Sequence, residues 1–387
     1  MIHIEDKTKC SGCMSCYNSC PTKCIQMKED EEGFWYPIVN SSKCINCGKC
    51  ENVCPYISNV IPSHDYEICY AAYNKNMVER NVSSSGGIFI MFANYVISTG
   101  GVVYGAAFDD EYMVYHQKAE SVAELKKLVG SKYLQSRIEF TYIDVYEELI
   151  KKRNVLFVGT TCQVAGLRAF LGKEYQNLIT IDFICLGVPS PKVWKAYLET
   201  MYDINSIKFI NFKDKSEGWH NFCLRIDNPE KQVKIGRETY YFTGYFKQLF
   251  SRPSCSECFF KGKNRVSDIT ISDCWGYKHI APEMDDNNGL SSVICHSEKG
   301  SMFFEAVKAN LIWKDAKIED VRKYNNNYWK SAPMGKDRKA FWEDFDKISK
   351  YELFENYCKP QKNSKILAIV KKIWIRFTVV VNKMRGK

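Results

Sequence analysis

The sequence has 387 residues, of which 45% are hydrophobic and 26% charged, a composition typical of a globular protein with more than one domain. The net charge of +9 comes almost entirely from residues 361–387, which hold eight Lys and Arg and no acidic residue, so the rest of the chain has 46 basic and 45 acidic side chains. A nearly neutral body excludes a nucleic-acid-binding domain, because such domains carry a clustered basic face.

The start of the chain and its cysteines favour a cytoplasmic location. The segment MIHIEDKTKC lacks the apolar stretch of a secretory signal, and the sequence contains no run of 18 apolar residues that predicts a membrane-spanning helix. The 18 cysteines occur in short clustered spacings. In a chain without a secretion signal, such spacings are typical of metal binding and redox chemistry.

The first 60 residues contain one cysteine motif twice. Each copy follows C-x2-C-x2-C-x3-C and ends with a proline, at Pro21 and at Pro55. The spacing is typical of domains with two 4Fe-4S clusters, in which the fourth cysteine of each motif ligates the other cluster. The predicted ligands are Cys10, Cys13, Cys16 and Cys54 for one cluster, and Cys44, Cys47, Cys50 and Cys20 for the other.

Structural zinc is the alternative for these thiols, because four thiolates also suit that metal. Cys24 lies outside the pattern and is expected to be a small buried residue. The segment between the motifs, 31–40, predicts a turn and a strand.

After a linker at 61–64, predicted strands and helices alternate. Strands are predicted at 67–74, 101–108, 154–159 and 178–184, and helices at 88–98 and 163–171. The order strand, helix, strand from 154 to 184 predicts a βαβ unit and therefore a parallel or mixed sheet. Residues 212–248 favour an antiparallel, irregular region.

Four further cysteines form a candidate site for a third 4Fe-4S cluster. Cys162 and Cys185 each follow a predicted parallel strand, and the carboxyl ends of such strands meet at the edge where ligands bind. Cys255 and Cys258 add a C-x2-C pair. The alternatives are a zinc site, or cysteines that pack as small apolar residues.

Other cysteines leave the assignment open. Cys274 could replace one of the four ligands, whereas Cys69, Cys223, Cys295 and Cys358 have no patterned partner and are expected to be structural. Cys162 as a catalytic nucleophile is a weaker alternative, because no histidine lies near it in sequence to activate it.

Three polar loops indicate a phosphate-bearing cofactor, for which a flavin is the hypothesis. Free N–H groups at a helix start, together with hydroxyls, bind phosphate, although Ser and Thr are also common helix caps. The candidate residues are Ser83, Ser84, Ser85, Gly86, Gly87, Ser131, Lys132, Tyr133, Thr160 and Thr161.

The same segments carry a resemblance to a known family. SSSGG, GSKYLQS, GTTCQVAGL, DFICLGVPSP and RPSCSECFFKGKNRVSDITISDCWG occur in the order seen in the beta subunits of coenzyme F420-reducing hydrogenase and of F420-linked dehydrogenases. From about residue 65 to about residue 300 the chain resembles this family, here with a ferredoxin domain at its N-terminus. SDCWG departs from the family pattern, in which the position of Cys274 is more often aromatic.

The resemblance implies FAD beside a 4Fe-4S cluster held by Cys162, Cys185, Cys255 and Cys258, with the three polar loops lining the flavin. It also implies that the flavin exchanges electrons between the clusters and a small-molecule two-electron substrate. The family acts on several substrates, and the sequence does not identify this one.

The sequence therefore predicts an α+β protein: a ferredoxin-type domain with two 4Fe-4S clusters at 1–62, a mixed α/β domain that binds flavin and a cluster at 63–330, and a helical extension at 331–387. Two functions fit these parts. The first is an iron-sulfur flavoprotein oxidoreductase. The second is an electron-relay module that connects a partner enzyme to the ferredoxin pool.

The basic tail predicts an amphipathic helix over 365–384. Ile366, Val370, Ile373 and Phe377 fall on one stripe, with lysines and Arg376 beside it. This pattern favours peripheral contact of residues 365–387 with the inner face of a membrane, and the alternative is a terminal helix packed on its own core.

Overall fold

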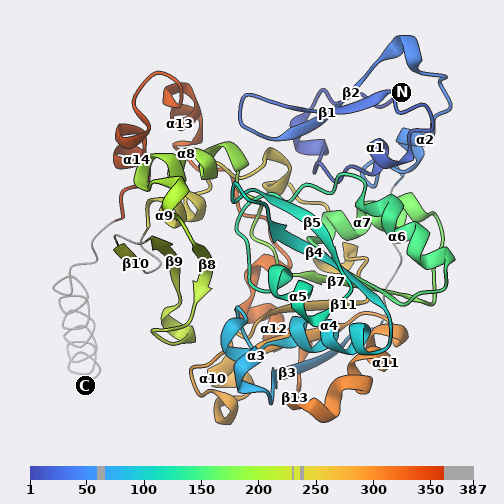
Figure 1. The fold of residues 1–387 in the computed structure, drawn as a ribbon, viewed down its shortest axis with the longest axis vertical. Coiled ribbons are helices and arrows are strands. Elements are labelled where there is room, and N and C mark those ends of the chain that lie inside the picture. The colour runs from blue at the N-terminus through green and yellow to red at the C-terminus, as the bar shows by residue number, and fades with distance from the viewer. Residues whose placement is uncertain (59–65, 229–230, 236–238, 361–387) are drawn as a thin grey trace, which may run out of the picture.

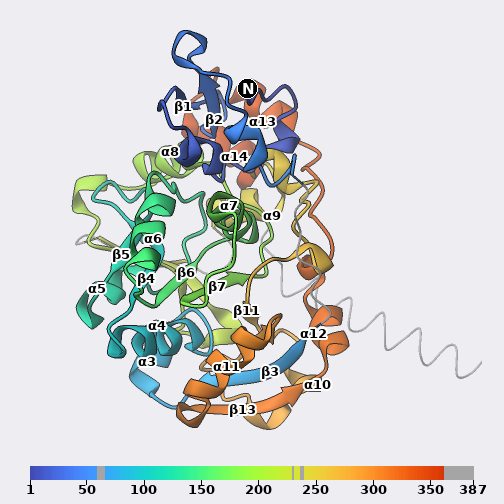
Figure 2. The ribbon, with the colours of Figure 1, turned by 90° about the vertical axis from the view of Figure 1, so that its right-hand side faces the viewer.

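The computed structural model describes residues 1–58, 66–228, 231–235 and 239–360. The predicted tail helix of 365–384 lies outside the described residues. Figures 1 and 2 show a small N-terminal domain on one end of a larger body. The larger body is built on one mixed sheet, so the predicted α+β class is confirmed.

The N-terminal domain is a two-stranded hairpin beside two short helices. Strands β1 (Ile25–Glu29) and β2 (Trp35–Val39) pair antiparallel, as the predicted turn and strand require. Helices α1 (Ser15–Ser19) and α2 (Lys49–Asn52) each follow the first cysteines of one motif. The core between these elements is small, since its buried apolar residues are Ile2, Cys24 and Ile25.

The body has an eight-stranded sheet in the order β13-β3-β12-β11-β7-β6-β4-β5. In that order the strands are β13 (Leu311–Ala316), β3 (Ile68–Asn74), β12 (Ser291–Cys295), β11 (Ile269–Asp273), β7 (Leu178–Phe183), β6 (Val155–Val158), β4 (Val102–Phe108) and β5 (Val114–Ala119). Strands β4, β6, β7 and β11 are parallel, which confirms the mixed sheet. Their carboxyl ends therefore lie at one edge, which we call the carboxyl edge.

Helices cover both faces of this sheet. One face packs against α4 (Ile88–Ser98), α5 (Val122–Leu128) and α11 (Glu298–Val307), which share a core with Val103, Leu156 and Ile181 of the strands. The opposite face packs against α6 (Thr141–Ile150) and α7 (Thr161–Leu171), and farther along against α10 (Tyr277–Ile280) and α12 (Ile318–Tyr324).

A second core lies beside the sheet. It contains α8 (Pro191–Met201), α9 (Tyr240–Phe246), α13 (Arg338–Asp344), α14 (Lys350–Cys358) and the antiparallel strands β8 (Phe209–Asp214) and β9 (Cys223–Asn228). Strand β10 (Lys231–Ile235) pairs antiparallel with β9. The predicted antiparallel region at 212–248 is thus found. Helices α13 and α14 pack into this core, so the predicted boundary at residue 330 stays a prediction.

The N-terminal domain is fixed to the body by polar contacts. At the hairpin tip, Glu32 pairs with Arg338 of α13, and its carbonyl accepts a 2.5 Å hydrogen bond from Ser190. Near α1, the Asn18 side chain donates to the Glu139 carbonyl at 2.7 Å. The domain is therefore held to the body at the hairpin tip and at α1.

Candidate functional site

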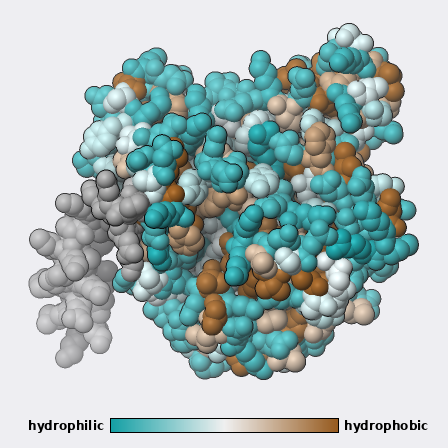
Figure 3. Space-filling model, in the orientation of Figure 1, coloured by the Kyte–Doolittle hydropathy of each residue, from teal (hydrophilic) through white to brown (hydrophobic). Residues whose placement is uncertain are grey.

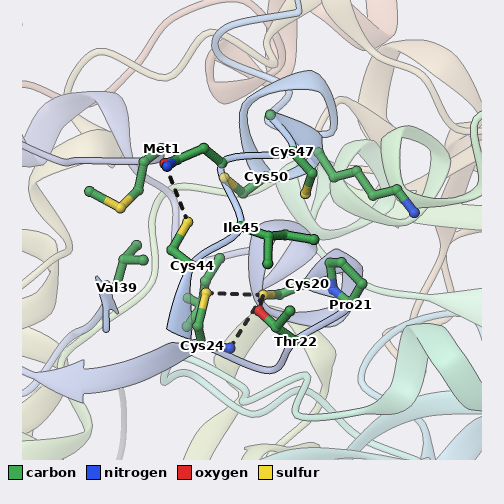
Figure 4. A pocket seen from close by; sticks show the side chains of 14 residues that line it. Met1, Cys20, Pro21, Thr22, Cys24, Val39, Cys44, Ile45, Cys47 and Cys50 are labelled. Atoms are coloured by element: carbon green, nitrogen blue, oxygen red, sulfur yellow. Dashed lines mark hydrogen bonds between the residues drawn. The ribbon is translucent and has the colours of Figure 1, made fainter. Parts of the chain in front are cut away.

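The structure brings the eight N-terminal cysteines together in the two sets that the sequence predicts. Cys20, Cys44, Cys47 and Cys50, the outer group, line one cavity (Figure 4). Cys10, Cys13, Cys16 and Cys54, the inner group, line another. Each set therefore consists of the first three cysteines of one motif and the fourth cysteine of the other.

The outer cavity contains a fifth thiol. Cys24 is buried, and its Sγ lies 3.4 Å from the Sγ of Cys20, while its backbone N–H donates to the same sulfur at 3.3 Å. The expectation of a buried Cys24 thus holds, and its thiol contacts a predicted ligand.

The third set of cysteines lies at the carboxyl edge and is called the sheet-edge group. Cys162 is in the first turn of α7 directly after β6, Cys185 follows β7, and Cys255 and Cys258 come from the loop after α9. Burial, and then the charges of Cys258 and Cys185, raises the pKa of Cys162 to about 12. Thiols this close together in a buried place ionise only with compensating positive charge, which a metal centre provides.

Cys274 lies apart from the sheet-edge group. It is fully buried in the core between the sheet and α10, where burial, opposed by a hydrogen bond with Ser292, raises its pKa to about 11. Its packing is that of a small apolar residue.

The inner group directly adjoins the sheet-edge group. A Cβ on Gly166 of α7 would lie 2.8 Å from the Cβ of Cys13, so only glycine permits this approach. Tyr56 lies among thiols of both groups: burial, followed by charges on Cys162, Cys258, Cys255 and Cys10, raises its pKa. The outer, inner and sheet-edge groups therefore follow one another toward the sheet.

Arg252 lies between the inner and sheet-edge groups. Its guanidinium is 1% exposed and donates to the Cys10 carbonyl at 2.8 Å, to the Cys10 Sγ at 3.7 Å and to the Trp35 carbonyl at 3.1 Å. It also interacts electrostatically with Cys255, three residues away in the chain. Sequence reasoning missed this residue, although an arginine directly before PSCSEC was a usable signal.

The thiols suit iron-sulfur clusters, because backbone N–H groups are directed at their sulfurs. Ile2 donates to Cys50 Sγ at 3.4 Å and Val188 to Cys255 Sγ at 3.4 Å. Such bonds stabilise anionic cluster sulfur. In the described ranges, no three His, Cys, Asp or Glu side chains are close enough together to hold a single metal ion.

Two of the three predicted flavin loops lie side by side. The backbone N–H of Ser131 donates to Ser84 Oγ at 2.7 Å, and the two hydroxyls are 3.0 Å apart. Gly87, with φ +78°, precedes α4 and caps it without a side-chain hydrogen bond. These loops follow α3 (Met77–Val82) and α5, where exposed apolar side chains gather (Figure 3), among them Val78, Val82 and Val122.

Most polar side chains of the predicted flavin loops already have partners in the chain. Ser83 Oγ donates to the Glu79 carbonyl, and Ser85 Oγ to the Leu290 carbonyl. Lys132 Nζ donates to the carbonyls of residues 127 and 129, and burial lowers its pKa to about 7. The Tyr133 ring packs edge-on against Phe242. A phosphate or flavin here would therefore be bound largely through backbone groups.

The third loop caps α7. The Thr160 backbone N–H donates to Gln163 Oε1 at 3.0 Å in a capping box, the Thr160 hydroxyl donates to the same oxygen at 3.0 Å, and the Thr161 hydroxyl accepts from buried Arg265 at 3.1 Å. These contacts agree with the capping role that the sequence left open, and they fix the helix that carries Cys162.

Two cations that sequence reasoning missed hold the 83–87 loop in place. Lys215 Nζ donates to the carbonyls of Arg80, Ser85 and Asn288 at 2.6, 2.9 and 2.7 Å, and burial lowers its pKa to about 7. The buried Arg80 guanidinium makes a bidentate pair with Asp286 at 2.7 and 2.6 Å. Both contacts join residues more than 70 positions apart, so no local pattern could have indicated them.

Comparisons with known proteins match the two cysteine-bearing segments. Residues 9–57 match the family of 4Fe-4S dicluster domains. Residues 152–320 match the family described as the C terminus of the beta subunit of coenzyme F420 hydrogenase/dehydrogenase. No curated protein matches the chain.

A solved structure with a similar chain is the xenon-derivatised F420-reducing [NiFe] hydrogenase complex from Methanosarcina barkeri. The two chains are 15% identical, with a TM-score of 0.49, and the match covers 73% of this chain and 93% of that chain. Within the ranges that the structure describes, no helix has the length and apolar character needed to cross a bilayer.

Proposed function

We propose that this iron-sulfur electron-transfer module is a flavin-dependent oxidoreductase. The proposal starts from two matches. Residues 152–320 match the beta-subunit family of coenzyme F420 hydrogenase/dehydrogenase, and residues 9–57 match the 4Fe-4S dicluster domains. The proposal has electrons pass between the N-terminal clusters, a third cluster and FAD, which exchanges them with a small-molecule two-electron substrate. The observation that carries it is the succession of the outer, inner and sheet-edge groups, which ends at the carboxyl edge of the sheet.

The chain's own residues would bind and insulate the redox groups. Twelve thiolates would hold the three clusters, and N–H groups such as those of Ile2 and Val188 would stabilise the sulfurs. Tyr56 and Phe260, whose rings are 5.1 Å apart, exclude water from the passage between the inner and sheet-edge groups. The bound flavin would supply the change from one-electron to two-electron chemistry.

The carboxyl edge is the place proposed for the flavin. The loops 83–87 and 130–133 meet there, and ligands of open α/β sheets bind at this edge. Lys215 holds the first loop through the Ser85 carbonyl, so the start of α4 that follows this loop is kept in place for an anionic group. Cysteines that hold clusters rather than disulfides fit the cytoplasmic compartment that the sequence favours.

Anaerobic purification followed by iron, sulfide and flavin analysis tests the proposal. About 12 irons and one flavin per chain are expected, since each cubane contains four irons. Cys185→Ser should lower the iron content by about four. Cys274→Ser, the matched control at a buried cysteine outside the sheet-edge group, should leave it unchanged. About eight irons in the parent protein, with both variants unaltered, would reject the third cluster.

An electron-relay module without substrate chemistry is the second candidate. It is favoured by the intrachain partners of Ser83, Ser85, Thr160 and Thr161, which leave few free side-chain donors for a flavin. Protein that contains clusters that reduce normally, but no flavin, would support the relay. Protein-bound flavin that a small-molecule oxidant reoxidises would support the oxidoreductase.

A further inference from the structure

The outer group faces away from the body of the protein. Cys47 is exposed, whereas the inner and sheet-edge thiols are at least partly covered. In the parts of the chain that the structure describes, residues 20–24 and 41–52 make polar contacts only with other residues of the N-terminal domain. The hydrogen bonds of Cys24 and Ser42 are examples. This end of the domain is thus available for a partner.

Three lysines belong to, or directly adjoin in sequence, the residues that line the outer cavity. Lys49 lines it, Lys23 lies between the lining residues Thr22 and Cys24, and Lys43 directly precedes Cys44. All three lysines are exposed, and within the described ranges none of them forms an ion pair. The neighbouring Glu51 is neutralised by the amino terminus at 3.0 Å.

Exposed apolar side chains accompany the lysines. Ile45 lines the outer cavity between Cys44 and Cys47 in sequence and is 63% exposed, and Met1, also in the lining, is 49% exposed (Figure 4). Apolar contacts inside a charged rim are the usual anatomy of a transient protein interface. The opposite end of the hairpin is acidic, with Asp30, Glu31 and Glu32, but its acidic groups are occupied by Lys7 and Arg338.

From this arrangement we propose that residues 20–24 and 43–50 form the docking surface for a small acidic one-electron carrier protein. The inference rests on the proposed function, because the surface transfers electrons only if the outer group holds a cluster. Three unpaired lysines attract a negatively charged carrier and orient it over Cys47, where the path to its redox centre is shortest. One electron moves from the reduced carrier to the oxidised outer cluster, and no bond is made or broken.

The test is stopped-flow reduction of the anaerobic full-length protein by an acidic plant-type [2Fe-2S] ferredoxin, at several ionic strengths. The rate constant should fall as salt rises. The triple variant Lys23→Glu, Lys43→Glu, Lys49→Glu should react about tenfold or more slowly at low salt, and the salt dependence should reverse. The matched control changes three exposed lysines of the body, Lys126→Glu, Lys127→Glu and Lys152→Glu, and should stay within about twofold of the parent.

Measurements of iron content and of reduction by dithionite distinguish a failure of the docking surface from a failure of the proposed function. If every variant has the same iron content as the parent and dithionite reduces all of them equally, the clusters are intact. A difference in the rate of reduction by ferredoxin then reports on the docking surface alone. Equal ferredoxin rates for the lysine triple and the parent would then overturn the docking surface. Absence of iron-sulfur clusters from the parent protein would overturn the proposed function itself.

Discussion

Arg252 is a buried positive charge beside the inner group of cysteines. Its guanidinium contacts the Cys10 carbonyl and sulfur and is fixed over the Tyr36 ring at 4.2 Å. A cation beside a cluster stabilises the extra negative charge that reduction brings, and burial keeps solvent from screening it. The residue should therefore raise the reduction potential of the inner cluster.

Arg252→Gln should lower the midpoint potential of the inner cluster by roughly 60 mV, which is about a tenfold change in a one-electron equilibrium. Potentiometry followed by electron paramagnetic resonance measures it. Arg252→Lys keeps the charge and should shift the potential less. Lys9→Gln is the matched control, since Lys9 adjoins Cys10 in sequence but is exposed and paired with Glu257 at 3.1 Å. Equal shifts in Arg252→Gln and Lys9→Gln would contradict this assignment.

His116 makes the stability of the body depend on pH. Complete burial lowers its pKa from 6.5 to about 4, and its ring nitrogens bond to Ser136 Oγ at 2.7 Å and to the Val158 carbonyl at 3.0 Å. Between pH 6.5 and pH 4 the unfolded chain binds a proton that the folded protein does not. Stability should therefore fall as the pH drops through this window, by about 2 kcal/mol in total between pH 7 and pH 5.

Thermal unfolding of the anaerobic protein at pH 7 and pH 5 measures this effect. The loss of melting temperature on acidification should be smaller in His116→Gln than in the parent, because the variant has no imidazole to protonate. A variant that loses as much melting temperature as the parent would show that other groups cause the acid sensitivity.

Helix α7 is the element that joins the body to the N-terminal domain. Its first turn carries Cys162, and Gly166 in its middle lies against Cys13 and against the Tyr142 hydroxyl, each 2.8 Å from where a Cβ would be. The helix ends at Gly172, whose φ of +66° is a left-handed cap. Any change in the distance between α7 and the Cys13 loop therefore moves two cysteine groups relative to each other.

Gly166→Ala should destabilise the protein by about 1–3 kcal/mol, because the overpacking at Cys13 outweighs the gain in helix propensity of about 1 kcal/mol. It should also slow reoxidation of the N-terminal clusters by an oxidant that accepts electrons from the body. Chemical denaturation and stopped-flow absorbance measure the two effects. Gly105→Ala in β4, where the nearest atom is 3.5 Å from the new Cβ, is the control and should be tolerated.

Elements with strong local signals could be predicted from the sequence. Helix α4 spans the predicted residues 88–98, because its apolar run ends at Gly100 and Gly101. The β6-α7-β7 unit was predicted as well, although α7 begins two residues earlier than expected, since Thr160 and Gln163 form a capping box. The positions of β12 and β13 on either side of β3 could not be predicted, because their pairing joins segments some 200 residues apart and leaves no local pattern.

The candidate functional site likewise has parts that the sequence predicts and parts that it does not. The crossed grouping of the eight N-terminal cysteines and the proximity of Cys162 to Cys185 follow from motif spacing and strand order, and the structure has both arrangements. The contributions of Arg252 and Lys215 depend on which carbonyl groups the tertiary fold brings to them. The flavin loops remain a prediction, because their hydroxyls cap helices and bond to neighbouring loops.

At the scale of the whole molecule, the two parts differ in what stabilises them. The body has extensive cores on both faces of its sheet, whereas the N-terminal domain buries few apolar side chains of its own. A domain this small needs metal centres to stay folded. The clusters should therefore contribute to the folding of residues 1–58 far more than to that of the sheet.

Removing the clusters with a chelator and an oxidant should abolish amide protection in residues 1–58 and leave β3, β12 and β13 protected. Hydrogen exchange with mass spectrometry, before and after iron removal, measures this. Faster exchange should reach α7, whose Gly166 adjoins Cys13, but not α11 on the other face. A uniform loss of protection in both parts would contradict this division of stability.

The contact between Glu32 and Arg338 can form only late during synthesis on the ribosome. The hairpin tip emerges early, but its ionic partner in α13 is translated some 300 residues later, and domains fold in the order in which they emerge. The face around Cys13 is uncovered for a shorter interval, until α7 with Gly166 is translated about 150 residues later. Iron and sulfide can thus reach the inner group of cysteines before the body covers it.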